Sequence, residues 1–498
     1  MAKGTVSGVD TQDALGNVAI GGGAAVGVTT GVGNSIIGCA AGDAITTGKC
    51  NVVLGTNALG AGTTACLNIA IGQLALGAGV LACGGAGQAE GNIAIGESAL
   101  TAVTAGSNNI GMGLTSGDAL TTGTDNVAIG RLALSASPDG ADNIAIGRSA
   151  LAASDGVADQ NIAIGLSALG GADVSGADNI AMGKSAMDAL TSGACNIAMG
   201  INSLGASTTG CQNIALGYLA MSAGVVTGLR NIAIGGTSLD ALTSGRCNTA
   251  IGYAALGAST TGCHNLAIGE LALGGADTTG YGNIALGENA ADAITTGLDN
   301  IAMGLNALGV ATTGCKNIAI GRTALGGAAT TRNDNIVMGT NTADALTSGN
   351  TNVAIGILAL SSATTGCQNV AIGHTAMGAG VVTGKTNIAI GVNAADALTS
   401  GMCNIAIGKN ALGATTASLL SIAIGENALG SGNVSGGYNI SFGYSSSAAM
   451  TSGICNIAMG SNALGASTTG CNNVAIGISA LGGAVTTGIN NVAIGTNS

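Results

Sequence analysis

The pentapeptide Asn-Ile-Ala-Ile-Gly, seen at residues 161–165, recurs with close variants 28 times between residues 17 and 491. Its fifth place is Gly in every copy, and its first place is Asn in every copy except one, where Ser421 stands. Similarity at a short, fixed period is typical of repeat proteins, in which each unit packs on its neighbours. The motif and its spacing therefore constrain the fold of this chain more than any other feature.

Successive motifs are separated by 17 or 18 residues almost throughout. The one longer interval, 24 residues from Asn68 to Asn92, predicts an irregular surface insertion within residues 73–91. From Asn179 the intervals run 17, 17 and 18, and this triplet repeats six times up to Asn491. We therefore expect a short cap or joint at residues 1–16 and a continuous body at 17–498, with a strict 52-residue super-repeat at 179–498.

Each unit is numbered here from its motif Asn, which is place 1. Places 2 and 4 are Ile, Val, Leu or Met in nearly every copy, whereas places 1, 3 and 5 are Asn, Ala and Gly. This alternation predicts a short strand that turns places 2 and 4 to one side. A second apolar pair follows at places 8 and 9, as in Ala168 and Leu169, and a Thr/Ser/Gly segment completes the unit.

Two or three short strands with tight turns make one coil of a β-solenoid. The predicted fold is therefore an all-β parallel β-solenoid of about 28 coils with 17–18 residues each. At the usual strand spacing of ~4.8 Å its coils would form a rod on the order of 130 Å long. We expect the Ile side chains of places 2 and 4 to fill the interior, the Asn of place 1 to form a hydrogen-bonded ladder, and Gly to make the turn.

Place 3 is Ala in all but five copies, which have Ile36, Val53, Gly111, Val337 and Ser441. If places 2 and 4 face inward, place 3 faces outward. Place 6 varies freely between charged, polar and aromatic residues, as an exposed column should. A column outside the coil that is held to a methyl group predicts that another surface, most simply a neighbouring chain, packs against it.

Composition excludes several classes of protein. Charged residues are only 7% and aliphatic residues abound, unlike disordered chains, and the 90 Gly follow no three-residue period, unlike collagen. The net charge of −12 without a basic stripe argues against nucleic acid as a partner. No apolar run approaches the length of a membrane span, and no signal peptide is visible at the start, so membrane insertion is not expected.

The sequence offers no constellation for catalysis, cofactor binding or metal binding, and we expect no enzyme. His264 and His374 are far apart, and no Cys-x-x-Cys occurs. One group of Asp residues recurs every 52 residues, about 14 Å apart across three rungs, which is too far to share a calcium ion. These residues, predicted to satisfy turn backbone, are Asp188, Asp240, Asp292, Asp344 and Asp396.

Eleven of the 13 Cys residues fall just before a motif Asn. Four pairs lie 16 residues apart in consecutive units, so that each pair would share a corner of adjacent coils. At that corner they could form disulfides or remain stacked free thiols, and both alternatives stay open. The candidate pairs are Cys50/Cys66, Cys195/Cys211, Cys247/Cys263 and Cys455/Cys471.

The repeated string Asn-Ile-Ala-Ile-Gly-x-x-Ala-Leu resembles the head repeats of trimeric autotransporter adhesins, of the Hep/Hag type, and similar repeats in the tail fibres of phages and other viruses. The resemblance covers residues 17–498. It implies a left-handed β-roll with three chains packed about an axis, on an extracellular surface appendage or a virion. The adhesin units are commonly shorter, and their secretion signal, coiled-coil stalk and membrane anchor are not visible here.

Four functions follow as hypotheses. The first is a structural fibre or filament subunit that assembles with copies of itself, as a trimer or end to end. The alternative is an adhesin whose partner is a host surface or a glycan, contacted through place 6 and the insertion at 73–91. An ice-binding protein is a third, although adjacent Thr residues of a strand would give only one outward column. A pectin-lyase-like enzyme is a fourth, and the sparse charges disfavour it.

Overall fold

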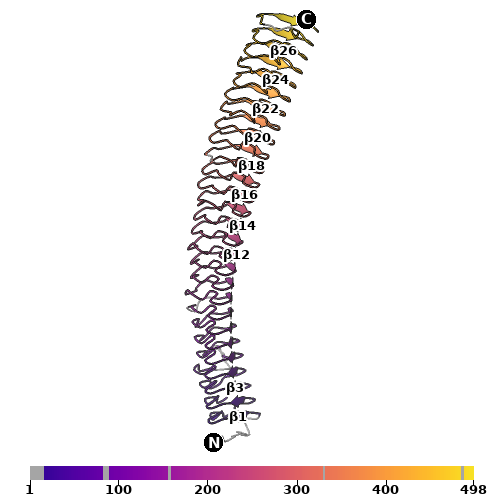
Figure 1. Ribbon diagram of the computed structural model, residues 1–498. Helices are drawn as coiled ribbons and strands as arrows, with labels where there is room; N and C mark the ends of the chain where they lie inside the picture. The colour runs from indigo at the N-terminus through magenta and orange to yellow at the C-terminus, as the bar shows by residue number, and fades with distance from the viewer. Residues whose placement is uncertain (1–15, 82–88, 155–158, 329–330, 484–486) are drawn as a thin grey trace. The chain divides into compact units, whose positions relative to one another are not determined.

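The computed structural model describes residues 16–81, 89–154, 159–328, 331–483 and 487–498. The chain divides into two compact units, Met1–Asn248 and Thr249–Ser498, and each is a parallel β-solenoid in which the chain winds through one coil per motif copy (Figure 1). The predicted all-β solenoid fold, with coils of 17–18 residues, is therefore confirmed.

Every strand is three residues long and covers places 2 to 4 of a motif. The described strands of the first unit are β1 (Val18–Ile20), β2 (Ser35–Ile37), β3 (Val52–Leu54), β4 (Ile69–Ile71), β5 (Ile93–Ile95), β6 (Ile110–Met112), β7 (Val127–Ile129), β8 (Ile144–Ile146), β9 (Ile162–Ile164), β10 (Ile180–Met182), β11 (Ile197–Met199), β12 (Ile214–Leu216) and β13 (Ile232–Ile234). Those of the second unit are β14 (Thr249–Ile251), β15 (Leu266–Ile268), β16 (Ile284–Leu286), β17 (Ile301–Met303), β18 (Ile318–Ile320), β19 (Ile336–Met338), β20 (Val353–Ile355), β21 (Val370–Ile372), β22 (Ile388–Ile390), β23 (Ile405–Ile407), β24 (Ile422–Ile424), β25 (Ile440–Phe442), β26 (Ile457–Met459), β27 (Val474–Ile476) and β28 (Val492–Ile494).

Within each unit, successive strands pair in register, so that equal places of neighbouring coils lie side by side. In β10 and β11, Ala181 pairs with Ala198, with the flanking places paired likewise. The N–H of place 2 donates to the place-1 carbonyl of the next coil, as from Ile180 to Asn196 at 2.8 Å. Because of this register, any property of one place is repeated along the unit as a column.

The prediction of two or three strands per coil is wrong for the described residues, where each coil has one strand. The other walls contain non-glycine residues with left-handed backbone at places 7 and 9 and just before the Asn, as at Ser185, Met187 and Cys195. These walls still hydrogen-bond from rung to rung, since the N–H of Leu169 donates to the carbonyl of Ala186 at 2.9 Å. Bends, rather than further strands, therefore close the coil.

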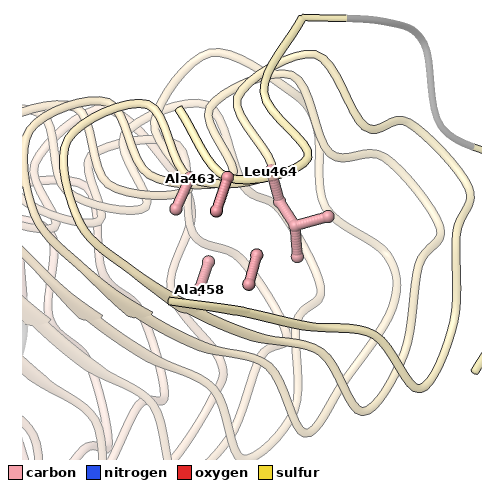
Figure 2. Packing of buried hydrophobic residues seen from close by; sticks show 5 residues of the cluster. Ala458, Ala463 and Leu464 are labelled. Carbon is pink, nitrogen blue, oxygen red and sulfur yellow. The ribbon is translucent and has the colours of Figure 1, made fainter. Parts of the chain in front are cut away.

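The interior is lined by place 1, place 3 and the apolar pair at places 8 and 9. Ala198 has no exposed surface, whereas Met199 next to it is 40% exposed. Figure 2 shows Ala458, at place 3, facing Ala463 and Leu464, at places 8 and 9, across the coil. The prediction that Ile fills the core and Ala faces outward is therefore wrong, because the alternation is correct but the two faces are exchanged.

The narrowness of the coil explains the exchange. At Gly111, the copy of place 3 that lacks a methyl group, an added Cβ would lie only 2.7 Å from Cγ of the buried Leu100. Place 5 is Gly for a related reason. Gly183 has φ of +137°, and a Cβ there would lie 2.5 Å from the carbonyl oxygen of Gly200 in the next coil.

Places 9 and 12 share one space in the core. In one coil place 9 is the small Ala395 and place 12 is the large Leu398. In another coil the order is reversed, with Leu360 at place 9 and Ala363 at place 12. All four side chains are buried. A Cβ added to Gly42, at place 9, would lie 2.8 Å from Cδ1 of the isoleucine at place 12 of the same coil. The three coil types of the super-repeat therefore differ in how they fill the same volume.

The long interval does not disturb the register, because β4 pairs with β5 through Ile69 and Ile93. Within the predicted insertion at 73–91, Leu76 still occupies place 9 and is buried, and Ala89 is buried as well. Residues 82–88 of that prediction, and residues 1–15 of the predicted cap, lie outside the described residues.

Candidate functional site

The side chains of places 2 and 4 form an outward-facing surface, here called the aliphatic face, on each unit. Every position of the face is aliphatic, Met or Phe except Ser35 and Thr249. These side chains are half-exposed, with Ile390 and Ile407 each 36% exposed. Two side chains in each of the thirteen strands of Met1–Asn248, less Ser35, provide 25 apolar residues, within the 20 to 30 that each side of a standard interface uses.

Two variable columns border the aliphatic face. On one side is place 6, with Lys184, Glu270 and Tyr218, and on the other is the residue before the Asn, with Asp178 and Lys316. Place 6 also holds some aliphatic residues, such as Ile357, but both columns together are largely polar. A constant apolar centre with a more variable and more polar border is the usual composition of a protein interface. The argument that a constant outward-facing column packs against another surface was applied to place 3, but it applies to places 2 and 4. The Ala of place 3 is constant because it packs in the interior of its own coil.

The predicted Asn ladder is present, and it lies inside the coil. Nδ2 of Asn196 donates to Oδ1 of Asn179 at 3.0 Å and to the carbonyl of Gly210 at 2.8 Å. The backbone N–H of Asn196 also donates to Oδ1 of Asn179, at 3.0 Å. Both Asn side chains are fully buried, so the ladder stabilises the coil and offers nothing to a ligand.

None of the four predicted cysteine pairs is joined by a disulfide. Cys66 is disulfide-bonded, but Cys50 is free. The two members of each pair belong to neighbouring columns, because one cysteine stands directly before the Asn and the other stands two residues before it. Sγ of Cys211, for example, accepts a hydrogen bond from the N–H of Ala194, the residue before Cys195, at 3.4 Å. The other predicted members are also free thiols, namely Cys195, Cys211, Cys247, Cys263, Cys455 and Cys471.

The recurrent Asp residues at place 10 fall into two groups. Asp240 accepts N–H bonds from Ser222 and Ala223, at 3.2 and 3.0 Å, as expected for a residue that satisfies turn backbone. Asp188 instead buries Oδ1 without a hydrogen-bond partner. Burial raises the pKa of the Asp188 carboxyl above its ordinary value, although a backbone hydrogen bond from Gly171 opposes the shift.

The second group contains Asp188, Asp292 and Asp344. In each case the preceding coil has Gly at place 11. A Cβ on Gly171 would lie 2.6 Å from Oδ1 of Asp188, and Gly275 and Gly327 meet Asp292 and Asp344 in the same way. Burial raises the pKa of Asp292 and Asp344 as well. The carboxylate therefore fits over the backbone only where Gly leaves room for it.

The Thr residues of the Thr-Thr-Gly segment lie in bends rather than strands. Thr208 is half-exposed and Thr209 is exposed, so both reach the surface, contrary to the single outward column expected of a strand. The hydroxyl of Thr191, one coil earlier, donates to the carbonyl of Thr208 at 2.9 Å. The hydroxyls of this first Thr column therefore form hydrogen bonds between adjacent coils.

In the described part of the chain, no group of three or more His, Cys, Asp or Glu residues is placed to hold a metal ion, and no helix is long and apolar enough to cross a membrane. Comparison of the chain with family models and with curated proteins finds no match in either.

Proposed function

We propose that this chain is a structural subunit of a fibre or filament, and that copies of it pack together through their aliphatic faces. The observation that carries the proposal is the face itself, which is exposed and yet aliphatic at nearly every position of 28 coils. Large exposed apolar surfaces mark interaction sites on soluble proteins.

A second copy of the chain is the occupant that fits this face best. The face repeats the same two side chains at every rung, ~4.8 Å apart. Only a surface with the same period can match it along its length, and another copy in register has that period. The mixed charges at place 6, such as the Lys409–Glu426 pair at 3.5 Å, allow complementary contacts at the border.

The resemblance to adhesin heads supports three chains as the number in the assembly and a cell surface or virion as its location. We propose the left-handed sense of the coil on the same basis. Burying the aliphatic face requires copies to lie side by side, so end-to-end joining alone would leave the face exposed.

Light scattering of the purified protein, followed by negative-stain microscopy, tests the proposal. The native chain is expected to be an oligomer at micromolar concentration. A variant with Thr at six positions of the face should stay folded and have a lower mean mass than the native chain at equal concentration, because Thr249 and Ser35 already occupy place 2 of strands β14 and β2. The six substitutions are Ile388→Thr, Ile390→Thr, Ile405→Thr, Ile407→Thr, Ile422→Thr and Ile424→Thr.

The matched control places Thr at exposed apolar residues of place 6, with Ile357→Thr, Val392→Thr and Ile478→Thr, and should keep the native mass. A native protein that is monomeric, or a six-site variant that keeps the native mass, would contradict assembly through this face.

A further inference from the structure

Three open notches recur at one register of the super-repeat among the described residues. Each contains the place-10 aspartate of one coil and extends over the next two coils. The notches of Asp188, Asp292 and Asp396 have volumes of about 320, 400 and 250 Å³. Repetition at equivalent residues makes the notch a property of the repeat rather than an accident of one loop.

The lining mixes polar and apolar side chains, and none of the described residues that form it carries a positive charge. In the Asp292 notch the carboxylate is joined by Asn289 and by Asn306 of the next coil. In the Asp396 notch, Nδ2 of Asn393 donates to Oδ1 of Asn410 at 3.3 Å. In the Asp396 notch the amides therefore form a row in which donors and acceptors have fixed directions. The Asp188 notch has one amide, Asn202, together with the hydroxyls of Ser185 and Ser222.

Glycine at place 10 of the middle coil keeps the notch open. A Cβ on Gly309 would have Asn306 O as its nearest neighbour, at 3.2 Å, and Gly205 and Gly413 have similar room, at 3.0 and 3.1 Å. A small side chain can therefore be accommodated, and Ser361 occupies the equivalent place in another super-repeat. The backbone alone does not demand Gly here, in contrast to Gly183.

Size and charge limit what can bind. The lining residues come from three rungs, whose outer members are about 9.6 Å apart by strand spacing, whereas the ligands of one metal ion lie within about 5 Å of each other. The absence of Lys and Arg from the lining disfavours anionic ligands. A carboxylate next to oriented amides matches neighbouring hydroxyl groups, each of which both donates and accepts a hydrogen bond.

We propose that each notch binds a sugar residue of a neutral glycan. The notch lies on the wall of places 7 to 11, and place 8 faces place 3 across the interior, so this wall is opposite the aliphatic face (Figure 2). Glycan binding is thus compatible with assembly and does not depend on it. Within Thr249–Ser498, the Asp292 and Asp396 notches are six rungs apart, about 29 Å, so a long glycan can engage both.

Saturation-transfer NMR with neutral hexose trisaccharides of gluco, galacto and manno configuration tests the proposal on the intact chain. At least one trisaccharide is expected to receive saturation from the protein. The triple variant Asp188→Ala, Asp292→Ala, Asp396→Ala should weaken that binding at least tenfold. The control variant Asp125→Ala, Asp142→Ala, Asp299→Ala removes three charges from the residues just before the motif Asn. It should bind the trisaccharide as the native chain does.

A second variant blocks the space without touching the carboxylates. Gly205→Gln, Gly309→Gln and Gly413→Gln together should abolish the saturation transfer, while circular dichroism shows an unchanged fold. The proposal is overturned if no neutral trisaccharide binds, if both triple variants bind like the native chain, or if only charged sugars or calcium ions compete for the notch.

Discussion

The one copy of the motif without Asn shows how single residues of the ladder depend on each other. In most other copies Gly stands three residues before the next Asn, and a Cβ on Gly401 would lie 3.0 Å from Nδ2 of Asn404. Besides Ser418, the exceptions include Ala65, Ala89 and Arg332. At the exceptional copy, Ser418 replaces this Gly and Ser421 replaces the Asn. Oγ of Ser418 lies within hydrogen-bond distance of Oγ of Ser421, at 2.9 Å, and of the carbonyl oxygen of Gly436, at 3.1 Å, which is the carbonyl that the missing amide would bond. Its single proton serves one of these two acceptors at a time.

The two serines are therefore expected to be coupled. Ser421→Asn alone should destabilise the protein by about 1–3 kcal/mol, because the new amide meets the Ser418 side chain in a packed interior. The double variant Ser418→Gly, Ser421→Asn should be at least as stable as the native chain. Urea unfolding of the native chain, the single variants Ser418→Gly and Ser421→Asn, and the double variant gives the coupling energy. Additive effects of the two substitutions would contradict the interpretation.

Arg332 departs most from the pattern of its column. Equivalent places hold Gly280 and Gly384, but the Arg332 side chain is fully buried and none of its three nitrogens has a hydrogen-bond partner. Burial lowers the pKa of this guanidinium to about 9, and the charge of Asp344 opposes the shift. The folded chain thus carries a poorly compensated charge in its core.

Arg332→Gly should stabilise the protein by about 3 kcal/mol at pH 7, because it removes this buried charge. Since the folded-state pKa is below the unfolded one, native stability should also rise as the pH increases through about 9, whereas below that pH the penalty is fully present. The variant should lack this rise. Urea unfolding from pH 7 to pH 10 measures both effects, and the exposed Arg246→Gly serves as the control.

At the scale of the coil, exchange of volume between places 9 and 12 is the main packing rule. Ala395→Leu should cost about 1–3 kcal/mol, because Leu398 already fills the shared space. Adding Leu398→Ala should recover most of that loss by recreating the arrangement of Leu360 and Ala363. Thermal unfolding of the single and double variants tests this, and a double variant less stable than Ala395→Leu would refute the rule.

The strand could be predicted from the sequence, but the side that faces inward could not be read from the alternation. Places 2, 3 and 4 are all nearly constant, so either side satisfied the pattern. The volume available inside the coil decides. The methyl of Ala181 fits opposite an apolar pair with a large second residue, whereas the larger Ile36 at place 3 lies close to Gly42 at place 9. One signal was available, since place 1 shares a side with place 3 and an Asn ladder is strongest when buried.

At the scale of the whole molecule, the repeat predicted the number of coils and their parallel stacking, because each copy of the motif forms one strand. The notches escaped prediction, since each combines residues from three coils and places 7 and 10 show no chemical motif within one unit. The exposed aliphatic face escaped for the opposite reason, because its residues resemble those of an ordinary core.

Each unit therefore carries two different surfaces on opposite walls of the same coil. The aliphatic face is constant along the chain and serves the proposed contact with other copies. The polar wall changes with the 52-residue period and holds the proposed glycan sites. Substitutions on one wall should leave the other unaffected, because each place contacts mainly its equivalents in adjacent coils.

The in-register 52-residue block also has a consequence for inheritance. Recombination between repeats of the gene can add or remove one complete block, and every coil of the product still meets a neighbour of the type it packs against. Loss of a single coil would instead break the order of large and small residues at places 9 and 12. Selection can thus change the extent of the proposed contact surface in steps of three coils, without evolving a new fold.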